Sequence, residues 1–230
     1  MASIDSTSKP ENKSLRVLVT GFGMNTDTDL YNQPFRNIET NPSWLAAKPL
    51  SNQTLKFTQS ASPGHPHAPK PRPVEVEVHI STLEVPVTYS AVLGTVPPIH
   101  QSKQYDFILH VGVGLSGGVA IERLAHKTGY NQPDAEGRLC DLIRSKPKGD
   151  DADELVKRGF GNGFEQFGEE LRSRLDVDAI VKHLKSKGLE KEASKVKVLF
   201  MHVPPVGSPY QIEDMTGAIK GVIEYVALHT

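Results

Sequence analysis

A histidine at the end of an apolar run is the first residue whose position could support catalysis. Apolar residues lead from Val198 to His202, and Pro204 and Pro205 then end any regular structure. Catalytic side chains of α/β domains collect at strand ends, because the sheet holds the residue rigidly while the following loop opens to solvent. A histidine in this place can equally be a hydrogen-bonded core residue. The choice depends on the partners that the rest of the chain brings to it.

A glycine-rich loop after another apolar run offers two further chemistries. Gly112, Gly114 and Gly117 match the dinucleotide-binding pattern G-x-G-x-x-G. No strand with a terminal acid follows about 20 residues later, which argues against a bound cofactor. The same loop has G-x-S-x-G spacing around Ser116, with His202 downstream in the order of a hydrolase triad. Ser116 is therefore a candidate nucleophile, although no second oxyanion segment accompanies it.

Glu122 follows this loop within the segment VAIERLAHKTGY, which we expect to be helical. A carboxylate beside an imidazole fixes the tautomer of the ring and stabilises imidazolium, which is the orienting role in a nucleophile–histidine–acid relay. Glu122 would take that role if it reached the sheet edge that carries His202. Otherwise it is a solvated helix glutamate.

Whole-chain properties narrow the classes of function. Lys and Arg number 26 against 27 Asp and Glu, which gives no electrostatic case for nucleic acid or an anionic membrane surface. No apolar run approaches the roughly 18 residues of a membrane span. Cys140 is the only cysteine, so no internal disulfide is expected and the cytosol is the predicted compartment. His65 and His67 lack acidic or cysteine partners, so no metal site is expected.

Strands that alternate with helices predict the scaffold. Strands are expected at 15–20, 74–80, 105–113 and from Val198, and helices after Asn41-Pro42, at 176–187 and from about Ile212. This alternation predicts one α/β/α sandwich around a mostly parallel sheet, with helices on both sides. The domain is expected to span 15–230, after a disordered lead-in at 1–14 and with an irregular Pro-, Ser- and His-rich insertion at 51–73. No pattern assigns a structure to 136–175.

Five segments, in this order, resemble the pyroglutamyl peptidase I family: RVLVTGFG, TNPSW, LEVPVTY, HVGVGLSGGVAIERLAHKTGY and FMHVPPVGSPY. These are cytosolic cysteine peptidases that remove an N-terminal pyroglutamate from peptides. The resemblance implies an α/β/α sandwich, no cofactor, and pyroglutamyl peptides as partners. Glu122, in AIERLAH, matches the family's catalytic acid, and His202, in HVPP, matches its catalytic base.

The resemblance also implies a substrate pocket. Phe22, in TGFG, matches an aromatic residue that packs on the lactam ring, and Phe35, in QPFRN, is matched to a second one, although residues 24–33 separate the two halves of the motif. Pyroglutamate is a compact neutral ring, so aromatic faces and one or two backbone hydrogen bonds can select it. An unpaired ammonium would be costly in such a pocket.

The resemblance fails where the family carries its nucleophilic cysteine. In the family this residue lies in a strand–loop–helix unit between the helix matched by 176–187 and the strand of His202. Here 189–197 joins those two elements directly. The sheet is therefore expected to be short of one strand–helix unit, and the peptidase to be inactive or weak. Cys140, in EGRLCDL, echoes the lost motif but is expected to be a bystander thiol. The open alternatives are a protein that binds pyroglutamyl peptides without cleaving them, a Cys140 enzyme, and a serine hydrolase using Ser116.

Overall fold

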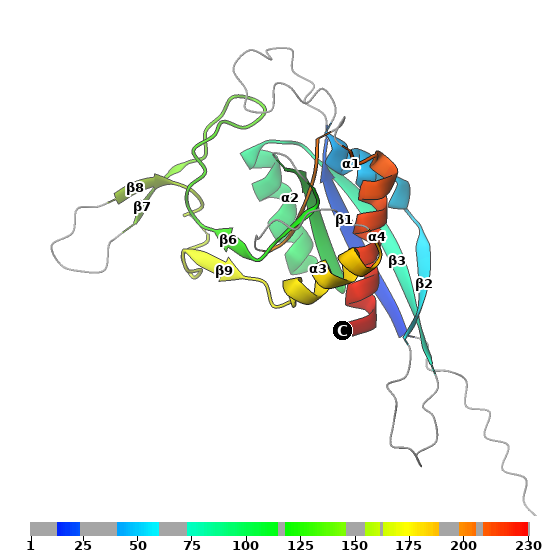
Figure 1. The fold of residues 1–230 in the computed structure, drawn as a ribbon. Coiled ribbons are helices and arrows are strands. Elements are labelled where there is room, and N and C mark those ends of the chain that lie inside the picture. The colour runs from blue at the N-terminus through cyan, green and yellow to red at the C-terminus, as the bar shows by residue number, and fades with distance from the viewer. Residues whose placement is uncertain are drawn as a thin grey trace, which may run out of the picture.

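A six-stranded sheet forms the centre of the protein. The computed structural model describes residues 13–23, 41–59, 73–114, 118–145, 155–161, 163–188, 198–205 and 209–229. The sheet has the order β2-β3-β1-β4-β10-β5 (Figure 1). Its strands are β1 (Lys13–Phe22), β2 (Thr54–Gln59), β3 (Val74–Val85), β4 (Phe107–Val113), β5 (Ala120–Glu122) and β10 (Val198–Val203). The four central strands run parallel, while β2 and β5 pair antiparallel at the two edges. The predicted mostly parallel α/β sheet is confirmed.

Helices cover both faces of this sheet. They are α1 (Pro42–Ala47), α2 (Tyr89–Ser102), α3 (Val177–Ser186) and α4 (Ile212–His229). Side chains alternate between the two faces of a strand. Leu109 and Val111 of β4 lie in the core that includes α4, whereas His110 between them contacts His100 of α2. Hence α2 lies on the face opposite to α4, as Figure 1 also shows.

The helix ends follow the capping signals in the sequence. Asn41 accepts a hydrogen bond from the Ser43 N–H at the start of α1, with Pro42 in the first turn. Asp176 accepts one from the Ala179 N–H at the start of α3, and Gly188 follows that helix with a φ of 67°. One face of α4 is apolar and buried: Met215, Ile219, Val222, Ile223 and Val226. Since burying each such side chain contributes about 1.5–3 kcal/mol, this stripe fastens α4 to the sheet.

The helix expected from Val119 to Tyr130 is wrong. The segment forms β5 and a second short strand, β6 (Leu124–His126). Val119 and Ile121 are buried two residues apart, which is the spacing of a strand face, and β5 adds to the sheet by pairing with β10. The helical pattern of this segment is overridden because an open strand edge supplies backbone partners and a buried face at once.

Two further two-stranded ribbons lie beside the sheet. β6 pairs with β9 (Glu170–Arg172), and β7 (Leu142–Ser145) pairs with β8 (Leu155–Arg158). We call the described residues from 127 to 169 the lobe; Figure 1 shows it standing to one side of α2. It accounts for most of 136–175, which the sequence pattern does not assign.

Two expectations about the segments outside the core can be compared with the structure. The insertion expected at 51–73 is regular in its first part, because 54–59 form β2 with Leu55 and Phe57 packed against the core. Residues 60–72, like the expected lead-in up to residue 12, lie outside the described residues. Among the described helices, none is both long enough and apolar enough to cross a membrane.

Two glycines provide a test of the packing between α1 and β1. A methyl group at Gly21 would lie 2.7 Å from the Ser43 carbonyl oxygen and the Trp44 Cα, both backbone atoms of α1. A methyl group at Gly94, inside α2, would meet no atom within 4 Å. We expect Gly21→Ala to lower the free energy of unfolding by about 1–3 kcal/mol through overpacking. Gly94→Ala should raise it by about 0.5–1 kcal/mol through the better helix propensity of alanine. Urea denaturation measures both, and equal midpoints would contradict the packing described.

Candidate functional site

The structure brings Glu122 and His202 together at the edge of the sheet. β5 and β10 pair antiparallel with Ala120 opposite His202, so Glu122 and His202 project from the same face. The ladder has an irregularity between Val198 and Met201, next to this pair. The Glu122 Oε1 atom lies 3.4 Å from the His202 Nδ1 atom. This carboxylate–imidazole geometry is the one that an orienting acid and a base require.

Partial burial sets the protonation state of this pair. The Glu122 side chain is 17% exposed and that of His202 34%. Burial lowers the pKa of His202 from its ordinary value, and the Glu122 carboxylate opposes this by raising it. The lowering by burial is the larger effect, so the ring is neutral at neutral pH. A neutral imidazole whose Nδ1 faces a carboxylate has its Nε2 atom available as a proton acceptor.

Gly112 of β4 and Gly114, just after that strand, make room for the Phe200 and His202 side chains. A methyl group at Gly112 would lie 2.5 Å from the Phe200 ring, and one at Gly114 would lie 3.2 Å from the His202 Cβ atom. The glycines that match a dinucleotide-binding pattern therefore serve close packing against β10. Ser116 and Gly117, the other residues of interest in the loop, lie outside the described residues.

An aromatic wall adjoins the carboxylate–imidazole pair. Phe22 ends β1, and its ring centroid lies 6.1 Å from that of Phe200. The Phe200 ring in turn meets the His202 ring edge-on at 5.1 Å. Phe35, the second predicted pocket residue, lies outside the described residues. Sequence reasoning missed Phe200, although its position two residues before His202 on a strand placed it on the same face.

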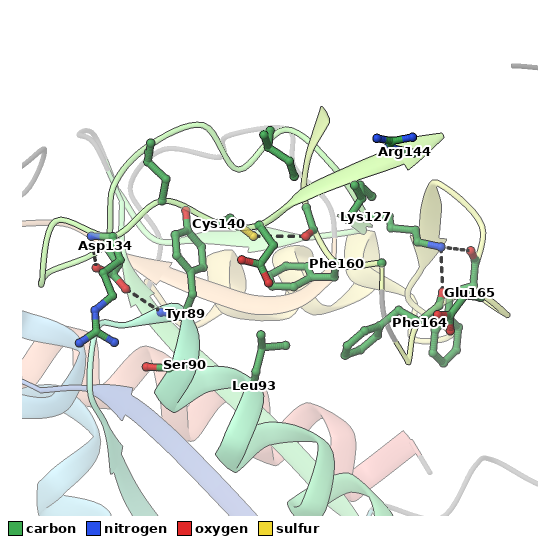
Figure 2. Close-up of a pocket in the computed structure, with 18 of the residues that line it drawn as sticks. Tyr89, Ser90, Leu93, Lys127, Asp134, Cys140, Arg144, Phe160, Phe164 and Glu165 are labelled. Carbon is green, nitrogen blue, oxygen red and sulfur yellow. Dashed lines mark hydrogen bonds between the residues drawn. The ribbon is translucent and has the colours of Figure 1, made fainter. Parts of the chain in front are cut away.

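Cys140 lies in a different environment from the pair. Its side chain is 3% exposed, and its Sγ atom donates a hydrogen bond to the Gly159 carbonyl oxygen at 3.4 Å. Burial raises the pKa of this thiol, which is the opposite of what activates a nucleophile. It lies on the wall of a cavity bounded by the lobe and α2, and neither Glu122 nor His202 lines that cavity (Figure 2). The segment 189–197, where the family's cysteine unit is expected to be missing, lies outside the described residues.

A second polar cluster lies on the same face of the sheet. His110 of β4 is the register partner of Phe200. Its Nδ1 atom lies 2.8 Å from the Thr20 Oγ1 atom, and its Nε2 atom lies 3.0 Å from the Nε2 atom of His100. Burial, more than the neighbouring His100, lowers the pKa of His110 to about 4, so both hydrogen bonds involve a neutral ring. Among the described residues, no group of three or more His, Cys, Asp or Glu side chains could hold a metal ion.

Removing the carboxylate of the pair should change the titration of the ring. In Glu122→Gln, burial continues to lower the pKa of His202 while the opposing charge is gone. We therefore expect the pKa of His202 to fall further below its ordinary value. Titration of the His202 ring signals by NMR in the two proteins measures the shift. An unchanged or higher pKa in the variant would show that the two groups do not interact.

The buried His110 should make the protein sensitive to acid. The pKa of His110 is about 4 when folded and about 6.5 when unfolded, so the unfolded chain binds more protons between these values. Stability contributed by the neutral ring is complete above pH 6.5 and is lost as the pH falls towards 4. We expect this loss to reach about 3 kcal/mol and to be absent from His110→Gln. Urea denaturation at pH 7 and pH 4 tests it, with the exposed His126→Gln as the control that should behave as the unmodified protein.

Comparison with known proteins places these features in a family context. No family model matches the chain. The chain is 25% identical to human pyroglutamyl-peptidase 1 and 24% identical to the rat protein, in alignments that cover 90% of this chain and 88% of each relative. In fold it is similar to pyroglutamyl peptidase I of Bacillus amyloliquefaciens, with a TM-score of 0.60 at 19% identity over 94% of this chain and 98% of the other. A mutant pyrrolidone carboxyl peptidase of Pyrococcus furiosus gives a TM-score of 0.61 at 19% identity over 93% and 98% of the two chains. These relatives confirm the resemblance to the pyroglutamyl peptidase I family that the sequence motifs indicate.

Proposed function

We propose that this chain is a pyroglutamyl-peptidase-like protein that recognises peptides with an N-terminal pyroglutamate but hydrolyses them at no more than background rate. The observation that carries the proposal is that the acid–base pair and the thiol lie in different places. The acid–base pair lies at the sheet edge beside aromatic rings, while the only thiol of the chain is buried against a backbone carbonyl. The human and rat relatives carry the name pyroglutamyl-peptidase 1, which supports the substrate class.

Recognition rests on the aromatic wall. Phe22 and Phe200 offer apolar ring faces beside a neutral His202, which suits a flat uncharged lactam. A charged α-amino group in the same place would lose its hydration without gaining a paired carboxylate, because the Glu122 carboxylate already faces His202. The site would therefore favour pyroglutamate over an ordinary peptide N-terminus.

Hydrolysis needs a nucleophile that the pair can activate. In a thiol peptidase, an imidazole in the place of His202 takes the proton of a cysteine, and a carboxylate in the place of Glu122 stabilises the resulting imidazolium. The thiolate then attacks the pyroglutamyl carbonyl, the imidazolium protonates the peptide amine as it leaves, and water hydrolyses the acyl-enzyme to free pyroglutamate and the thiol. Cys140 is unsuited to this role because its proton is held by the Gly159 carbonyl and its pKa is raised by burial. The proposed outcome is binding without acyl-enzyme formation.

The alternatives differ in the residue that would be labelled or required. A Cys140 enzyme would lose its activity on Cys140→Ala and on treatment with iodoacetamide. A serine hydrolase would react with a fluorophosphonate at Ser116, lose that labelling on Ser116→Ala, and ignore iodoacetamide. A protein that only binds would have no hydrolysis for Cys140→Ala or iodoacetamide to remove, and a fluorophosphonate would not label it.

A fluorogenic pyroglutamyl amide tests the proposal on the purified protein. Since enzymes accelerate such reactions by about 10⁶-fold or more, an active site and background hydrolysis are easily separated. We expect release of the fluorophore at the uncatalysed rate, unchanged in Cys140→Ala, while calorimetry detects binding of a pyroglutamyl dipeptide. That binding should disappear in Phe200→Ala. Hydrolysis that Cys140→Ala abolishes would show the proposal to be wrong.

A further inference from the structure

The cavity between α2 and the lobe has no part in the function proposed so far. Its volume is about 1050 Å³, and its walls come from the first turns of α2 and from lobe residues between 127 and 169 (Figure 2). We propose that this cavity binds an uncharged aromatic or branched apolar side chain of a pyroglutamyl peptide, a few residues after its pyroglutamyl end. The inference rests on the proposed function and names the class of peptide that the protein prefers.

Exposed apolar side chains gather at this cavity. Among the described residues, six large apolar side chains are exposed, and four of them line it: Leu93, Leu139, Leu142 and Phe167, with 38–60% of each exposed. A concentration of apolar surface with a charged rim is typical of a binding groove. In Figure 2, Leu93 points from α2 towards the lobe. An apolar ligand would remove this surface from water.

A row of aromatic rings forms one side of the cavity. The Tyr89 ring lies 6.4 Å from that of Phe160 in an edge-on arrangement, Phe160 lies 5.9 Å from Phe164, and Phe164 lies 6.3 Å from Phe167. These spacings are those of interacting aromatic pairs, and a further ring can extend such a row. The wall therefore suits a phenyl group or a branched aliphatic side chain.

Two charged side chains of the cavity wall, Asp134 and Lys127, are hydrogen-bonded to backbone groups of the same walls. The Asp134 carboxylate accepts hydrogen bonds from three backbone N–H groups, those of Tyr89, Glu136 and Arg138. The Lys127 ammonium donates to the carbonyl oxygens of Phe164 and Phe167. An ionised ligand side chain would have to compete with these bonds for partners. An uncharged side chain would not.

Both walls of the cavity belong to segments that also carry, or contact, residues around the acid–base pair. On the lobe side, Lys127 follows Glu122 by five residues, so their Cα atoms are at most about 17 Å apart. The Lys127 N–H donates a hydrogen bond to the Glu169 carbonyl oxygen, and the Lys127 carbonyl oxygen accepts one from the Phe160 N–H. These two bonds hold the lobe against this segment. On the helix side, Leu93 precedes His100 by seven residues, or about 10 Å along α2. His100 contacts His110, the register neighbour of Phe200.

The Glu122–Lys127 separation limits the position of the recognised residue. Lys127 lines the cavity at most about 17 Å from Glu122, and an extended peptide advances about 3.3 Å per residue, so the side chain that enters the cavity belongs to the sixth residue at the latest, counting the pyroglutamate as the first. Because neither Glu122 nor His202 lines the cavity, we place this residue at position three or later. Short pyroglutamyl dipeptides would leave the cavity empty.

Calorimetry with a peptide series tests the inference. The ligands are the dipeptide pyroglutamyl-alanine, a pyroglutamyl hexapeptide with alanine at all the remaining positions, and four variants of that hexapeptide with phenylalanine at position three, four, five or six. Burial of one phenyl group is worth about tenfold or more in affinity. We expect at least one phenylalanine peptide to bind about tenfold more tightly than the all-alanine peptide.

Two matched variants test whether the tighter binding of a phenylalanine peptide comes from the cavity. Leu93→Glu places a charge in the cavity and should remove the phenylalanine preference while leaving dipeptide binding unchanged. Leu171→Glu is the control, because Leu171 is 44% exposed on β9 but does not line the cavity. A phenylalanine preference that is absent, or that survives Leu93→Glu, would overturn the inference while dipeptide binding upholds the proposed function. Failure of every pyroglutamyl ligand to bind would overturn both.

Discussion

The pairing of β5 with β10 is the interaction on which the site depends. Glu122 and His202 are far apart in the chain, and nothing local to either residue directs one towards the other. The antiparallel ladder at the edge of the sheet places both side chains on one face with 3.4 Å between carboxylate and imidazole. Without this edge pairing, Glu122 would be a charged residue of a solvated segment and His202 a half-buried ring with no partner.

Close packing around β10 explains several features that look unrelated in the sequence. Gly112 of β4 and Gly114 after it leave space for the Phe200 and His202 side chains, and Phe200 in turn meets Phe22 at the end of β1. The same face holds His110, which is kept neutral by burial and bonded to Thr20 and His100. The result is a face of neutral rings beside one carboxylate, which suits an uncharged cyclic ligand better than a charged one.

The lobe carries the thiol and one wall of the cavity, and both lie apart from the acid–base pair. It holds Cys140, the only thiol of the chain, buried against the Gly159 carbonyl oxygen, and it lines a cavity of about 1050 Å³ against α2. No residue of α2 is fully buried, and its Tyr89, Ser90 and Leu93 line the cavity on the side that faces the lobe. The acid–base pair and this cavity therefore occupy separate places, as the proposed recognition of a longer pyroglutamyl peptide requires.

The sequence by itself determined the elements with strong local signals: the capped helices at Asn41 and Asp176, the buried stripe of α4, and the apolar strands of a mostly parallel α/β sheet. It also indicated Glu122, His202 and Phe22 as residues of one site, through the order of the motifs. Only the tertiary structure decided that 119–126 are strands, that Phe200 joins the aromatic wall, and that Cys140 is buried in a separate lobe. The physical reason is that helix caps and stripes act within a few residues, whereas an edge strand takes its conformation from a partner many residues away.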